Sequence, residues 1–413
     1  MSLRVPPALY HRRFALLWVG FMISVAGSQM QLAALHWHIR ILTGEPDPLA
    51  LGSIGLARIL PVIVFSLVGG AVADTFNRRK IMFITQSAMA LVALALAALT
   101  FSGQMQLWHI YTLTAIQAVA IAFDLPARQA LVPNLVPAQD LPNAFSMTSI
   151  ASNTGSILGP ALSGLVIAAG GQGFTYLINA FSFLAVLAAL ALMGPVAQQA
   201  KPRRGPVINL TDIREGIHFI ATRPIIFSTM LLDFFATFFS SANTMMPIIA
   251  KDILKVNEVG YGILSSAQSI GAVSAGLIFS QVRVIRRQGR MFLGSVVVFG
   301  LMTILFGLSH SFPLAILALV GIGAADSVST IIRNTIRQLQ TPDYIRGRMT
   351  SINQIFFQGG PQLGEWEAGM VGQFFGVPAA IISGGMGAIL AVAIIAWRWP
   401  QLRTYNGDEP VAG

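Results

Sequence analysis

The sequence contains no cysteine and few charged residues. Without cysteine, the chain can form neither a disulfide framework nor a thiolate metal site. Charged residues make up 10% of the 413 positions, whereas an average soluble domain carries about 25%. The chain therefore lacks the polar surface that a soluble globule of this size needs. A soluble protein with long buried helices is the alternative, but such helices rarely recur along an entire chain.

Several functional motifs are also missing. No loop of the form Gly-x-x-x-x-Gly-Lys-(Ser/Thr) occurs, so ATP is not expected to drive any process within this chain. The six histidines are scattered and form no metal set or nucleophile–base pair. We therefore expect no metal site, no cofactor and no enzyme, including a membrane-embedded hydrolase. No small-residue cleavage site follows a short apolar stretch near the N-terminus, so no cleavable signal peptide is expected.

Long apolar blocks are the main feature that is present. Hydrophobic residues make up 54% of the chain, and the mean hydropathy is +0.70. A helix of about 20 apolar residues crosses a hydrocarbon core of about 30 Å. The blocks therefore predict an all-α membrane protein with twelve transmembrane helices. The expected spans lie at about 14–39, 49–73, 81–102, 108–125, 145–169, 174–194, 225–249, 260–283, 291–309, 312–333, 350–374 and 377–398.

The basic residues indicate the orientation of these spans. If the N-terminus is cytoplasmic, 22 of the 26 lysines and arginines fall in inside segments and three fall outside, which is a strong positive-inside bias. We therefore expect both termini in the cytoplasm. The net charge of +10 does not predict binding to nucleic acid, because the basic residues lie in short loops rather than on one face of a folded domain.

Internal similarity predicts two equivalent halves. Residues 147–150 and 349–352 share the sequence Met-Thr-Ser-Ile, and each copy opens a span and is followed by a Gly-Pro pair. A long polar connection separates the halves, and we expect an amphipathic helix over 209–221 on the membrane surface. The expected parts are an N-terminal six-helix half (1–193), a cytoplasmic linker (194–223) and a C-terminal six-helix half (224–413).

A short motif follows the second span. Residues 70–80 read Gly-Ala-Val-Ala-Asp-Thr-Phe-Asn-Arg-Arg-Lys and resemble the loop between spans two and three of the major facilitator superfamily, Gly-x-x-x-Asp-x-x-Gly-Arg-(Arg/Lys). The resemblance extends to the span number, the repeat and the linker. Asn77 replaces the usual glycine, and we expect this to be tolerated because asparagine also accepts a left-handed backbone.

The resemblance implies a conformational lock at this loop. Gly70 would allow close helix approach, and Asp74 would face the N-terminal dipole of the eleventh span. Arg78 would pair with an acid on the cytoplasmic side, for which Asp124 is the candidate. Arg79 is assigned to the same lock, although its charge also fits simple positive-inside anchoring.

Glycines and prolines mark the fifth and eleventh spans. In the fifth, the spacing Gly-x-x-x-Gly-Pro is similar to a motif common in exporters of the superfamily. Glycines four residues apart make one flat helix face, and a proline bends the helix by disrupting its hydrogen bonds. The expected packing residues are Gly155, Gly159, Pro160, Gly164, Gly360 and Pro361.

Three further stretches resemble the branch of the superfamily that includes bacterial enterobactin (siderophore) exporters, namely residues 126–133, 141–144 and 362–369. The resemblance implies multidrug or siderophore efflux by an antiporter in a bacterial inner membrane. The arginine that the family usually carries in its fourth span is absent from residues 108–123. Because this arginine is absent, the drug–proton antiport mechanism of the family cannot simply be assigned to this chain.

Charges within the spans are candidates for function, because a charge at mid-bilayer costs roughly 2.5–3.5 kcal/mol on insertion scales. Asp233 lies among apolar residues of the seventh span, where it either carries a proton or makes a hydrogen bond to another helix. Asp326 in the tenth span leads towards Arg333, and we expect it to be the structural partner of that arginine.

Arg58, Glu365 and Glu367 lie at similar depths in the second and eleventh spans, which meet in the superfamily. The two glutamates are about 200° apart around their helix, so at most one faces Arg58. We expect Arg58 to pair with one of them in an outer gate or a proton-sensitive site. A static ion pair, or an anionic substrate bound by Arg58, is the alternative.

Eight polar residues within the spans are candidates for a substrate cavity, and each fits hydrogen bonding between helices equally well. They are Gln29, Gln31, Asn153, Asn243, Gln268, Asn353, Gln354 and Gln358.

Together these features predict a secondary transporter that works by alternating access. The preferred prediction is proton-coupled export of a siderophore-like or amphipathic drug-like small molecule, by a monomer surrounded by membrane lipids. The alternatives are a facilitator or proton symporter that imports a small metabolite, and a lipid-moving transporter of the same fold.

Overall fold

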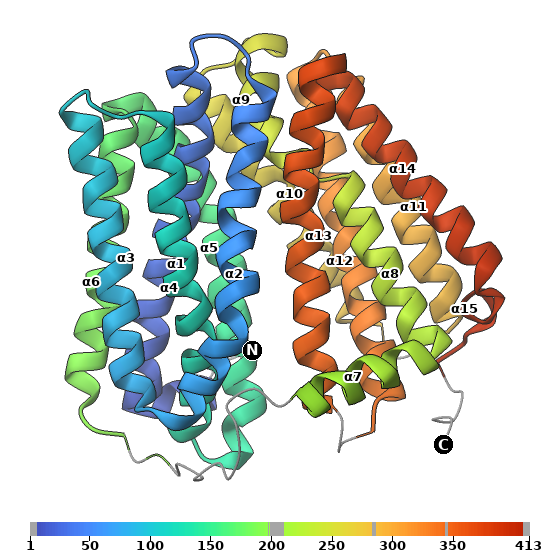
Figure 1. Cartoon of the computed structure of the whole chain (residues 1–413), viewed down its shortest axis with the longest axis horizontal. Coiled ribbons are helices and arrows are strands. Elements are labelled where there is room, and N and C mark those ends of the chain that lie inside the picture. Colours follow the sequence, from blue (N-terminus) through green and yellow to red (C-terminus); the bar gives the residue numbers. More distant parts are fainter. Residues whose placement is uncertain (1–5, 197, 199–209, 283–285, 343–345, 408–413) are drawn as a thin grey trace. The chain divides into compact units, whose positions relative to one another are not determined.

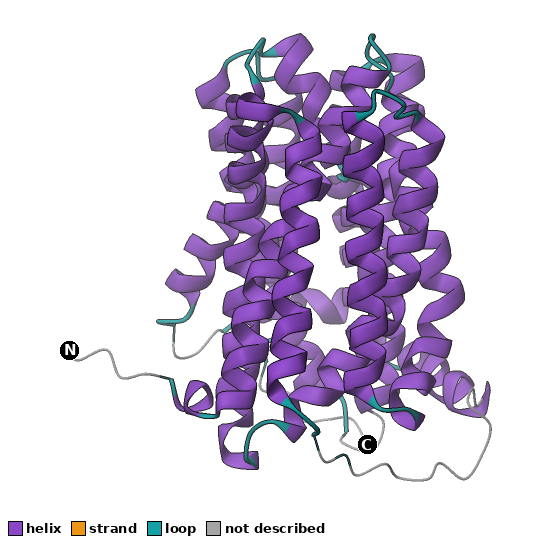
Figure 2. Cartoon of the chain, turned by 90° about the vertical axis from the view of Figure 1, so that its left-hand side faces the viewer, coloured by secondary structure: helices purple, strands orange, loops and turns teal. Residues whose placement is uncertain are grey.

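The computed structural model describes residues 6–196, 198, 210–282, 286–342 and 346–407. In this part of the chain, helices are joined by short loops and no strand is present (Figure 2). The helices are α1 (Arg12–Leu42), α2 (Pro48–Thr75), α3 (Arg78–Phe101), α4 (Leu107–Leu131), α5 (Leu141–Gly170), α6 (Gln172–Met193), α7 (Leu210–Thr222), α8 (Pro224–Phe239), α9 (Met246–Ile248), α10 (Glu258–Phe279), α11 (Gln288–Gly307), α12 (Phe312–Gln340), α13 (Arg346–Phe375), α14 (Val377–Arg398) and α15 (Pro400–Thr404).

Ten helices in the described part of the chain are long and apolar enough to cross a membrane. Two more fall outside those limits for different reasons. Helix α8 is apolar but has only 16 residues, whereas α13 has 30 residues but contains too many glycines, glutamines and other polar residues to be equally apolar. With these two helices included, the predicted all-α membrane fold with twelve spans is confirmed.

The seventh span differs from the continuous helix expected over 225–249. Helix α8 ends at Phe239, because Ser240 leaves helical geometry at φ −105° and ψ 20°. Ser240 Oγ donates to the carbonyl oxygen of Gly384 at 3.3 Å, and Ser241 Oγ donates to a carbonyl one turn earlier. Serine hydroxyls that bond the main chain in this way compete with helix formation. The chain then continues through a 3₁₀-helix (Ala242–Met245), α9 and a π-helix (Ile249–Ile253).

The chain forms two compact units, which we describe separately. Their boundaries cut two helices, because the first part of α2 is grouped with unit 2 and the first part of α10 with unit 1. Unit 1 comprises residues 1–42, 60–208 and 258–266, and unit 2 comprises residues 43–59, 209–257 and 267–413.

In unit 1, α1 packs against both α5 and α6, and α3 packs against α4 and α6 (Figure 1). Glycines bring α5 close to α1. A Cβ atom at Gly155 would lie 3.0 Å from the main-chain nitrogen of Ala26, and one at Gly159 would lie 2.8 Å from the carbonyl oxygen of the same residue. A larger residue at either position would therefore push the two backbones apart.

In unit 2, α13 packs against α8 and α14, and α11 packs against α12 and α14 (Figure 1). Gly364 of α13 faces the carbonyl group of Phe238, so these backbones also touch. Helix α7 contacts α8 and α13 and lies across the end of α8 (Figure 1). It forms where the sequence predicts an amphipathic helix, and its place on a membrane surface stays a prediction.

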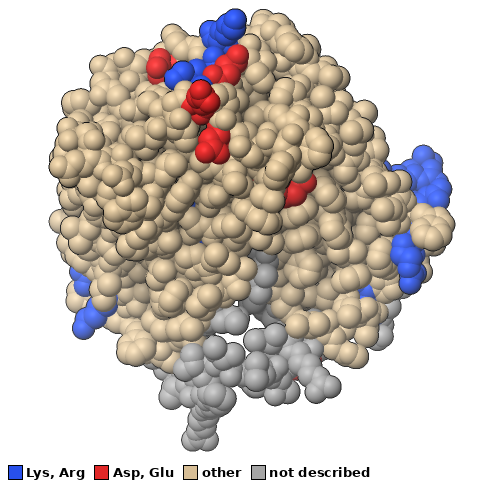
Figure 3. Space-filling model, turned by 45° about the horizontal axis from the view of Figure 1, so that its top comes forward, with Lys and Arg blue, Asp and Glu red and all other residues tan. Residues whose placement is uncertain are grey.

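The outer surface is apolar over much of the chain. Exposed large hydrophobic residues occur on most of the long helices, including Ile84 on α3, Leu192 on α6, Leu301 on α11 and Leu390 on α14. In Figure 3 most of the visible surface is uncharged; acidic and basic side chains lie together near the top, and further basic side chains lie at the right and lower left edges. Such a surface is unfavourable in water and suits a lipid environment.

Replacing Gly364 by alanine should destabilise the protein, because the added methyl group overlaps the main chain of Phe238. Overpacking of this kind costs about 1–3 kcal/mol, so the melting temperature of the purified protein in detergent should fall. Gly294→Ala is the matched control, since a Cβ atom there would meet nothing within 4 Å. Equal melting temperatures for the two variants would contradict this account of the packing.

Candidate functional site

The first part of α2 packs closely against α13 within unit 2. Gly52 and Gly55 are three residues apart and lie on one side of α2. A Cβ atom at Gly52 would lie 2.9 Å from the Cα of Gly369, and one at Gly55 would lie 2.9 Å from the Cβ of Glu365. Real Cβ atoms do not tolerate such distances, so glycine at these positions allows the two helices to approach.

Arg58 and Glu365 form an ion pair at this contact. Arg58 follows Gly55 by three residues, so its side chain leaves α2 on the side that faces α13. Nη1 of Arg58 lies 3.6 Å from Oε1 of Glu365, and the side chains are 30% and 11% exposed. This distance exceeds the hydrogen-bond range, which ends near about 3.2 Å. The structure therefore brings Arg58 to one of the two glutamates, in a contact that depends on charge alone.

The second carboxylate oxygen of Glu365 is not satisfied. Among the described residues, Glu365 Oε2 has no hydrogen-bond partner, and neither has Oε1 of Gln362, one turn earlier on α13. Buried acceptors without a donor are rare in proteins. A protonated carboxyl group would supply a donor that an ionised one lacks. One oxygen of the Glu365 carboxyl group therefore lies at the Arg58 contact, and the other is left without a donor.

Glu367 lies in a different environment. It follows Glu365 by two residues, or about 200° around α13, and it lines an apolar groove formed with α8 and α14. The sequence groups Glu365 and Glu367 in one coupling site, whereas the structure brings only Glu365 to Arg58.

Asp233 of α8 and Arg333 of α12 form a buried ion pair. Their side chains are 4% and 3% exposed, and Nη1 of Arg333 donates to Oδ1 of Asp233. The guanidinium carbon of Arg333 lies 5.6 Å from the ring centre of Phe357. The expectation that Asp326 is the partner of Arg333 is wrong. Asp326 lies seven residues before Arg333, or about 10 Å along the same helix, whereas Asp233 meets the arginine from the neighbouring helix.

Asp124 of α4 is held by three groups in unit 1. Its Oδ1 accepts hydrogen bonds from Thr85 Oγ1 and Gln86 Nε2, both at 2.9 Å. Its Oδ2 lies 3.5 Å from Nε of Arg128, one turn later on α4. Because Thr85 and Gln86 belong to α3, the buried carboxylate joins α3 to α4.

Arg78 does not pair with Asp124, contrary to the expectation. It donates to the carbonyl oxygens of Ala73 at 3.2 Å and Ala130 at 2.9 Å, and to Oδ1 of Asn134 at 2.9 Å. The arginine on α4 itself takes the carboxylate, since residues four apart on a helix are neighbours. Arg78 instead ties the start of α3 to the end of α4.

The close helix contact expected just before the loop after α2 is made by a different glycine. A Cβ atom at Gly70 would meet nothing within 4 Å, so the expected close approach at this residue is wrong. The approach occurs one residue earlier, where Gly69 faces the carbonyl group of Ala122. A shift of one residue turns a helix by about 100°, which the motif alone does not resolve. The side chain of Asp74 lies outside the described residues.

Asn77 does not use the left-handed backbone that its place in the motif suggested. Its φ is −66°, and its side-chain oxygen accepts a hydrogen bond from the main-chain nitrogen of Lys80 at 3.1 Å. Asn77 is therefore the N-cap of α3, a position that asparagine favours. Arg79 Nε donates to the carbonyl oxygen of Leu190 at 2.7 Å, which ties α3 to α6.

Two of the predicted cavity residues join helices in unit 1. Gln29 Nε2 donates to Ser156 Oγ at 3.0 Å. Gln31 is 1% exposed; it donates to Gln117 Oε1 and accepts from Asn179 Nδ2, both at 2.7 Å. Gln31 therefore connects α1 with α4 and α6, and of its two predicted roles this geometry supports the structural one.

The other cavity candidates differ in exposure. Asn153 is exposed, whereas Gln268, Asn353 and Gln358 are half-buried. The side chains of Asn243 and Gln354 lie outside the described residues.

The remaining glycines and prolines of the motif lie at helix contacts or inside helices. A Cβ atom at Gly164 would lie 3.0 Å from the Cα of Gly262, and one at Gly360 would lie 3.0 Å from the carbonyl oxygen of Phe234. Pro160 and Pro361 lie within α5 and α13, which continue past them.

The sequence interpretation missed Gly52 and Gly55, although they precede Arg58 at a constant spacing of three. That spacing places the glycines and the arginine on one helix stripe and would have identified the contact. It also missed Thr85 and Gln86, for which no local signal exists because their partner lies on another helix. Among the described residues, no group of three or more His, Asp or Glu side chains could hold a metal ion.

Comparison with known proteins identifies the family of this chain and several similar proteins. Residues 6–409 match the family described as transmembrane secretion effector. The chain is 24% identical over 404 residues to the enterobactin exporter EntS of Shigella boydii serotype 18 and to that of Escherichia coli O81, covering 97% of this chain and 95% of each exporter. The resemblance drawn from the sequence motifs is therefore confirmed.

Solved transporter structures share the fold. A POT family transporter in complex with a thioalcohol-conjugated peptide superposes with a TM-score of 0.76 at 14% identity, covering 94% of this chain and 96% of that one. A bacterial homologue of the human lysosomal transporter Spinster, inward-facing and unoccupied, gives a TM-score of 0.71 at 13% identity, covering 97% of both chains. These similarities support the twelve-helix fold and carry no information about substrate.

Replacing Asp233 by leucine should destabilise the protein by about 3–5 kcal/mol, because it leaves a buried arginine without its partner. The double variant Asp233→Leu with Arg333→Leu should recover most of this loss, since neither charge then remains. Thermal melting of the purified variants measures both effects. Asp326→Leu is the control and should change the melting temperature less. A double variant as unstable as Asp233→Leu would contradict the pairing.

Proposed function

Because the chain belongs to the transmembrane secretion effector family of the major facilitator superfamily, we propose that it exports a small molecule by proton-coupled alternating access. The chain is a multi-pass membrane transporter with exporters among its relatives. In the proposed cycle, two six-helix halves at residues 1–193 and 224–413 rock about a central site. The segment 194–223 links them. We assign the chain to transporters rather than to enzymes.

The proposed location is a bacterial inner membrane, with both termini in the cytoplasm and the protein acting as a monomer. The charge bias supports this orientation, since 22 of 26 basic residues then lie on the inner side. In this topology the start of α2 and the end of α13 lie towards the outer side. The contact between Arg58 and Glu365 is then an outer contact.

The Arg58–Glu365 pair is the observation that carries the proposal. It joins α2 to α13 beside Gly52 and Gly55, where the backbones are closest. Its attraction lasts only while Glu365 is ionised, since it includes no hydrogen bond. The uncompensated Oε2 of Glu365 further supports a role in which this carboxyl gains and loses a proton.

A proton on Glu365 would act as a switch on the outer contact. Ionised Glu365 attracts Arg58 and holds α2 against α13, which favours a closed outer side. A proton from the outer solution neutralises Glu365, removes this attraction and favours opening. Protonation of one carboxyl group would thus shift the equilibrium between the two states of the transporter, because it stabilises one state more than the other. Asp233 is less suited to this role, because Arg333 is its buried partner.

The inner side would be held by the loop after α2, which includes Gly70, Asp74 and Arg79. Arg78 and Asp124 contribute through separate partners, since Arg78 ties α3 to the end of α4 and Asp124 joins the middle of both helices. We propose that this loop restrains the inner side as a conformational lock.

The proposed cargo is a siderophore-like or amphipathic drug-like compound. Relatives over nearly the whole chain are enterobactin exporters, which supports the first class. A cluster of phenylalanines on α8, in which Phe234 stacks with Phe238 and Phe235 with Phe239, supports an aromatic or apolar solute. Import of a small metabolite and movement of lipid are the rival functions, and the direction of transport under an imposed gradient separates them.

Exchanging the two charges of the Arg58–Glu365 pair should restore transport that each single change slows. In proteoliposomes loaded with enterobactin or a lipophilic dye, Arg58→Glu and Glu365→Arg should each slow export by about tenfold or more, because each places two like charges together. The double variant Arg58→Glu with Glu365→Arg should regain a large part of the rate. Arg58→Glu with Glu367→Arg is the matched control and should not. Failure of the first combination would refute the gate.

The response to pH should depend on Glu365. Export by the unaltered protein should accelerate when the receiving side is more acidic than the substrate side. Glu365→Gln should make the rate insensitive to the gradient, because the amide carries no proton at this position. Glu45→Gln, in an exposed loop, should keep the normal response. A Glu365→Gln protein that still follows the gradient would exclude Glu365 as the coupling site.

A further inference from the structure

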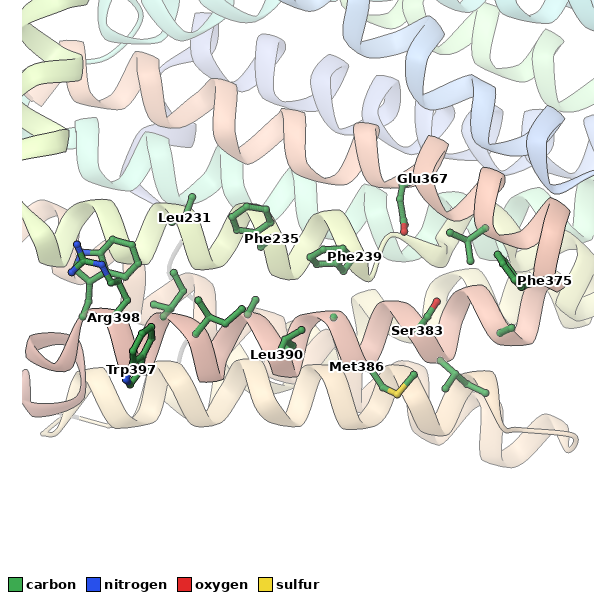
Figure 4. Close-up of a pocket in the computed structure, with 18 residues that line it drawn as sticks. Leu231, Phe235, Phe239, Glu367, Phe375, Ser383, Met386, Leu390, Trp397 and Arg398 are labelled. Atoms are coloured by element: carbon green, nitrogen blue, oxygen red, sulfur yellow. The ribbon is translucent and has the colours of Figure 1, made fainter.

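An apolar groove runs along α14 on the side where α8 and α13 pack (Figure 4). Its volume is about 1000 Å³, at the upper end of the range of about 300–1,000 Å³ for small-molecule sites. Phenylalanines form much of two walls, with Phe235 and Phe239 from α8 and Phe375 from α13. Met386 and Leu390 belong to the third wall, on α14. The groove lies entirely within unit 2.

The groove opens on the outer surface of that unit. Phe375 is 75% exposed, Leu390 60% and Trp397 80%, and all three line the groove. In a membrane protein, such exposed apolar side chains face lipid. A compound dissolved in the bilayer can therefore enter the groove from the side, without first crossing into water.

Two charged residues line the groove, and they lie far apart. Figure 4 shows Arg398 at one end and Glu367 projecting from α13 towards α8 and α14 nearer the other end. Ser383, the polar α14 residue nearest to Glu367 in this view, precedes Arg398 by 15 residues, or about 22 Å of helix. Arg398 is therefore too distant to neutralise Glu367, and no other basic residue lines the groove in the described part of the chain.

A carboxyl group in this place selects for positive charge. An ionised Glu367 in an apolar, lipid-facing groove needs a counter-charge, since the hydrocarbon offers none. The faces of nearby phenylalanine rings also attract cations. The remaining walls bury apolar surface. A ligand that satisfies all three features has one positive charge enclosed in a bulky apolar body.

We propose that this groove is a lateral binding site for lipophilic monocations, with Glu367 as the residue that recognises the charge. Binding itself does not require export, whereas calling the ligand a cargo rests on the proposed function. The site is separate from the Arg58–Glu365 contact, because Glu367 leaves α13 in a different direction from Glu365.

A second groove in unit 1 provides an internal comparison. It lies between α1 and α6, has a volume of about 330 Å³, and is lined by apolar residues with Arg12 as its charged member. This groove offers apolar burial and no carboxylate. The same cation should therefore bind at Glu367 and not here, so that one site dominates the binding curve.

The test uses two probes of nearly the same shape and opposite charge, tetraphenylphosphonium and tetraphenylborate. Their binding to the full-length protein in lipid nanodiscs is measured by scintillation proximity or equilibrium dialysis. Glu367→Gln should weaken tetraphenylphosphonium binding by about tenfold or more, because a neutral amide loses the ion pair with the cation. Glu367→Asp should retain most of it, and Glu45→Gln should change nothing. Tetraphenylborate binding should not weaken in Glu367→Gln.

Met386→Trp tests the shape of the groove, since it should obstruct the wall and weaken tetraphenylphosphonium binding without changing any charge. Cation binding unchanged in Glu367→Gln, or weakened equally for both probes, would overturn the inference and indicate a groove filled by phospholipid chains. Cation binding that depends on Glu367 in a protein that exports nothing would overturn the proposed function and support the groove. Export by a protein that shows no Glu367-dependent cation binding would support the proposed function and overturn the inference about the groove.

Discussion

Helices inside a bilayer gain little from burying apolar side chains against one another, because lipid tails are as apolar as leucine. Their association depends instead on close contact of main chains, which requires residues without bulky side chains. Gly155 and Gly159 provide this contact between α5 and α1, and Gly360 and Gly364 provide it between α13 and α8. The two helices that contain the same Met-Thr-Ser-Ile sequence, α5 and α13, thus make close contacts through glycine in both units.

The positions of the charged groups follow from these backbone contacts. Gly55 lets α2 approach α13 so closely that Arg58, one turn further, reaches Glu365. A larger residue at Gly55 would separate the helices and leave both charges without a partner. Packing and electrostatics are therefore coupled at this contact, since the close approach creates the ion pair and the pair in turn stabilises the approach.

Three acids in the described helices are stabilised to different degrees. Asp233 has an arginine as a buried hydrogen-bonded partner, and removing one member of such a pair is costly. Asp124 accepts two hydrogen bonds and lies beside the guanidinium group of Arg128. Glu365 has a longer contact with Arg58 and an oxygen without a partner. Glu365 is therefore the least satisfied of these three acids, and this is the basis on which we propose it as the site of proton exchange.

Depth in the membrane could be predicted from the sequence, whereas direction around a helix could not. The ends of each apolar block indicate where a span begins and ends. Counting residues from those ends therefore predicted that Arg58 and Glu365 lie at matching depths. A partner on another helix depends on rotation, and one residue turns a helix by about 100°. This is why Gly69 rather than Gly70 makes the close contact, and why Arg128 rather than Arg78 reaches Asp124. The break after Phe239 was missed because apolar residues continue on both sides of it.

The same rotation gives α13 two faces with different chemistry. Glu365 and Glu367 are two residues apart, so one is directed to α2 and the other to the groove beside α14. A helix is stiff over so short a distance, and these two side chains move together. Any rotation or shift of α13 that separates Glu365 from Arg58 must also displace Glu367 relative to α8 and α14. A proton at one glutamate and a cation at the other would therefore act on the same helix, and each would affect the binding of the other by the same factor.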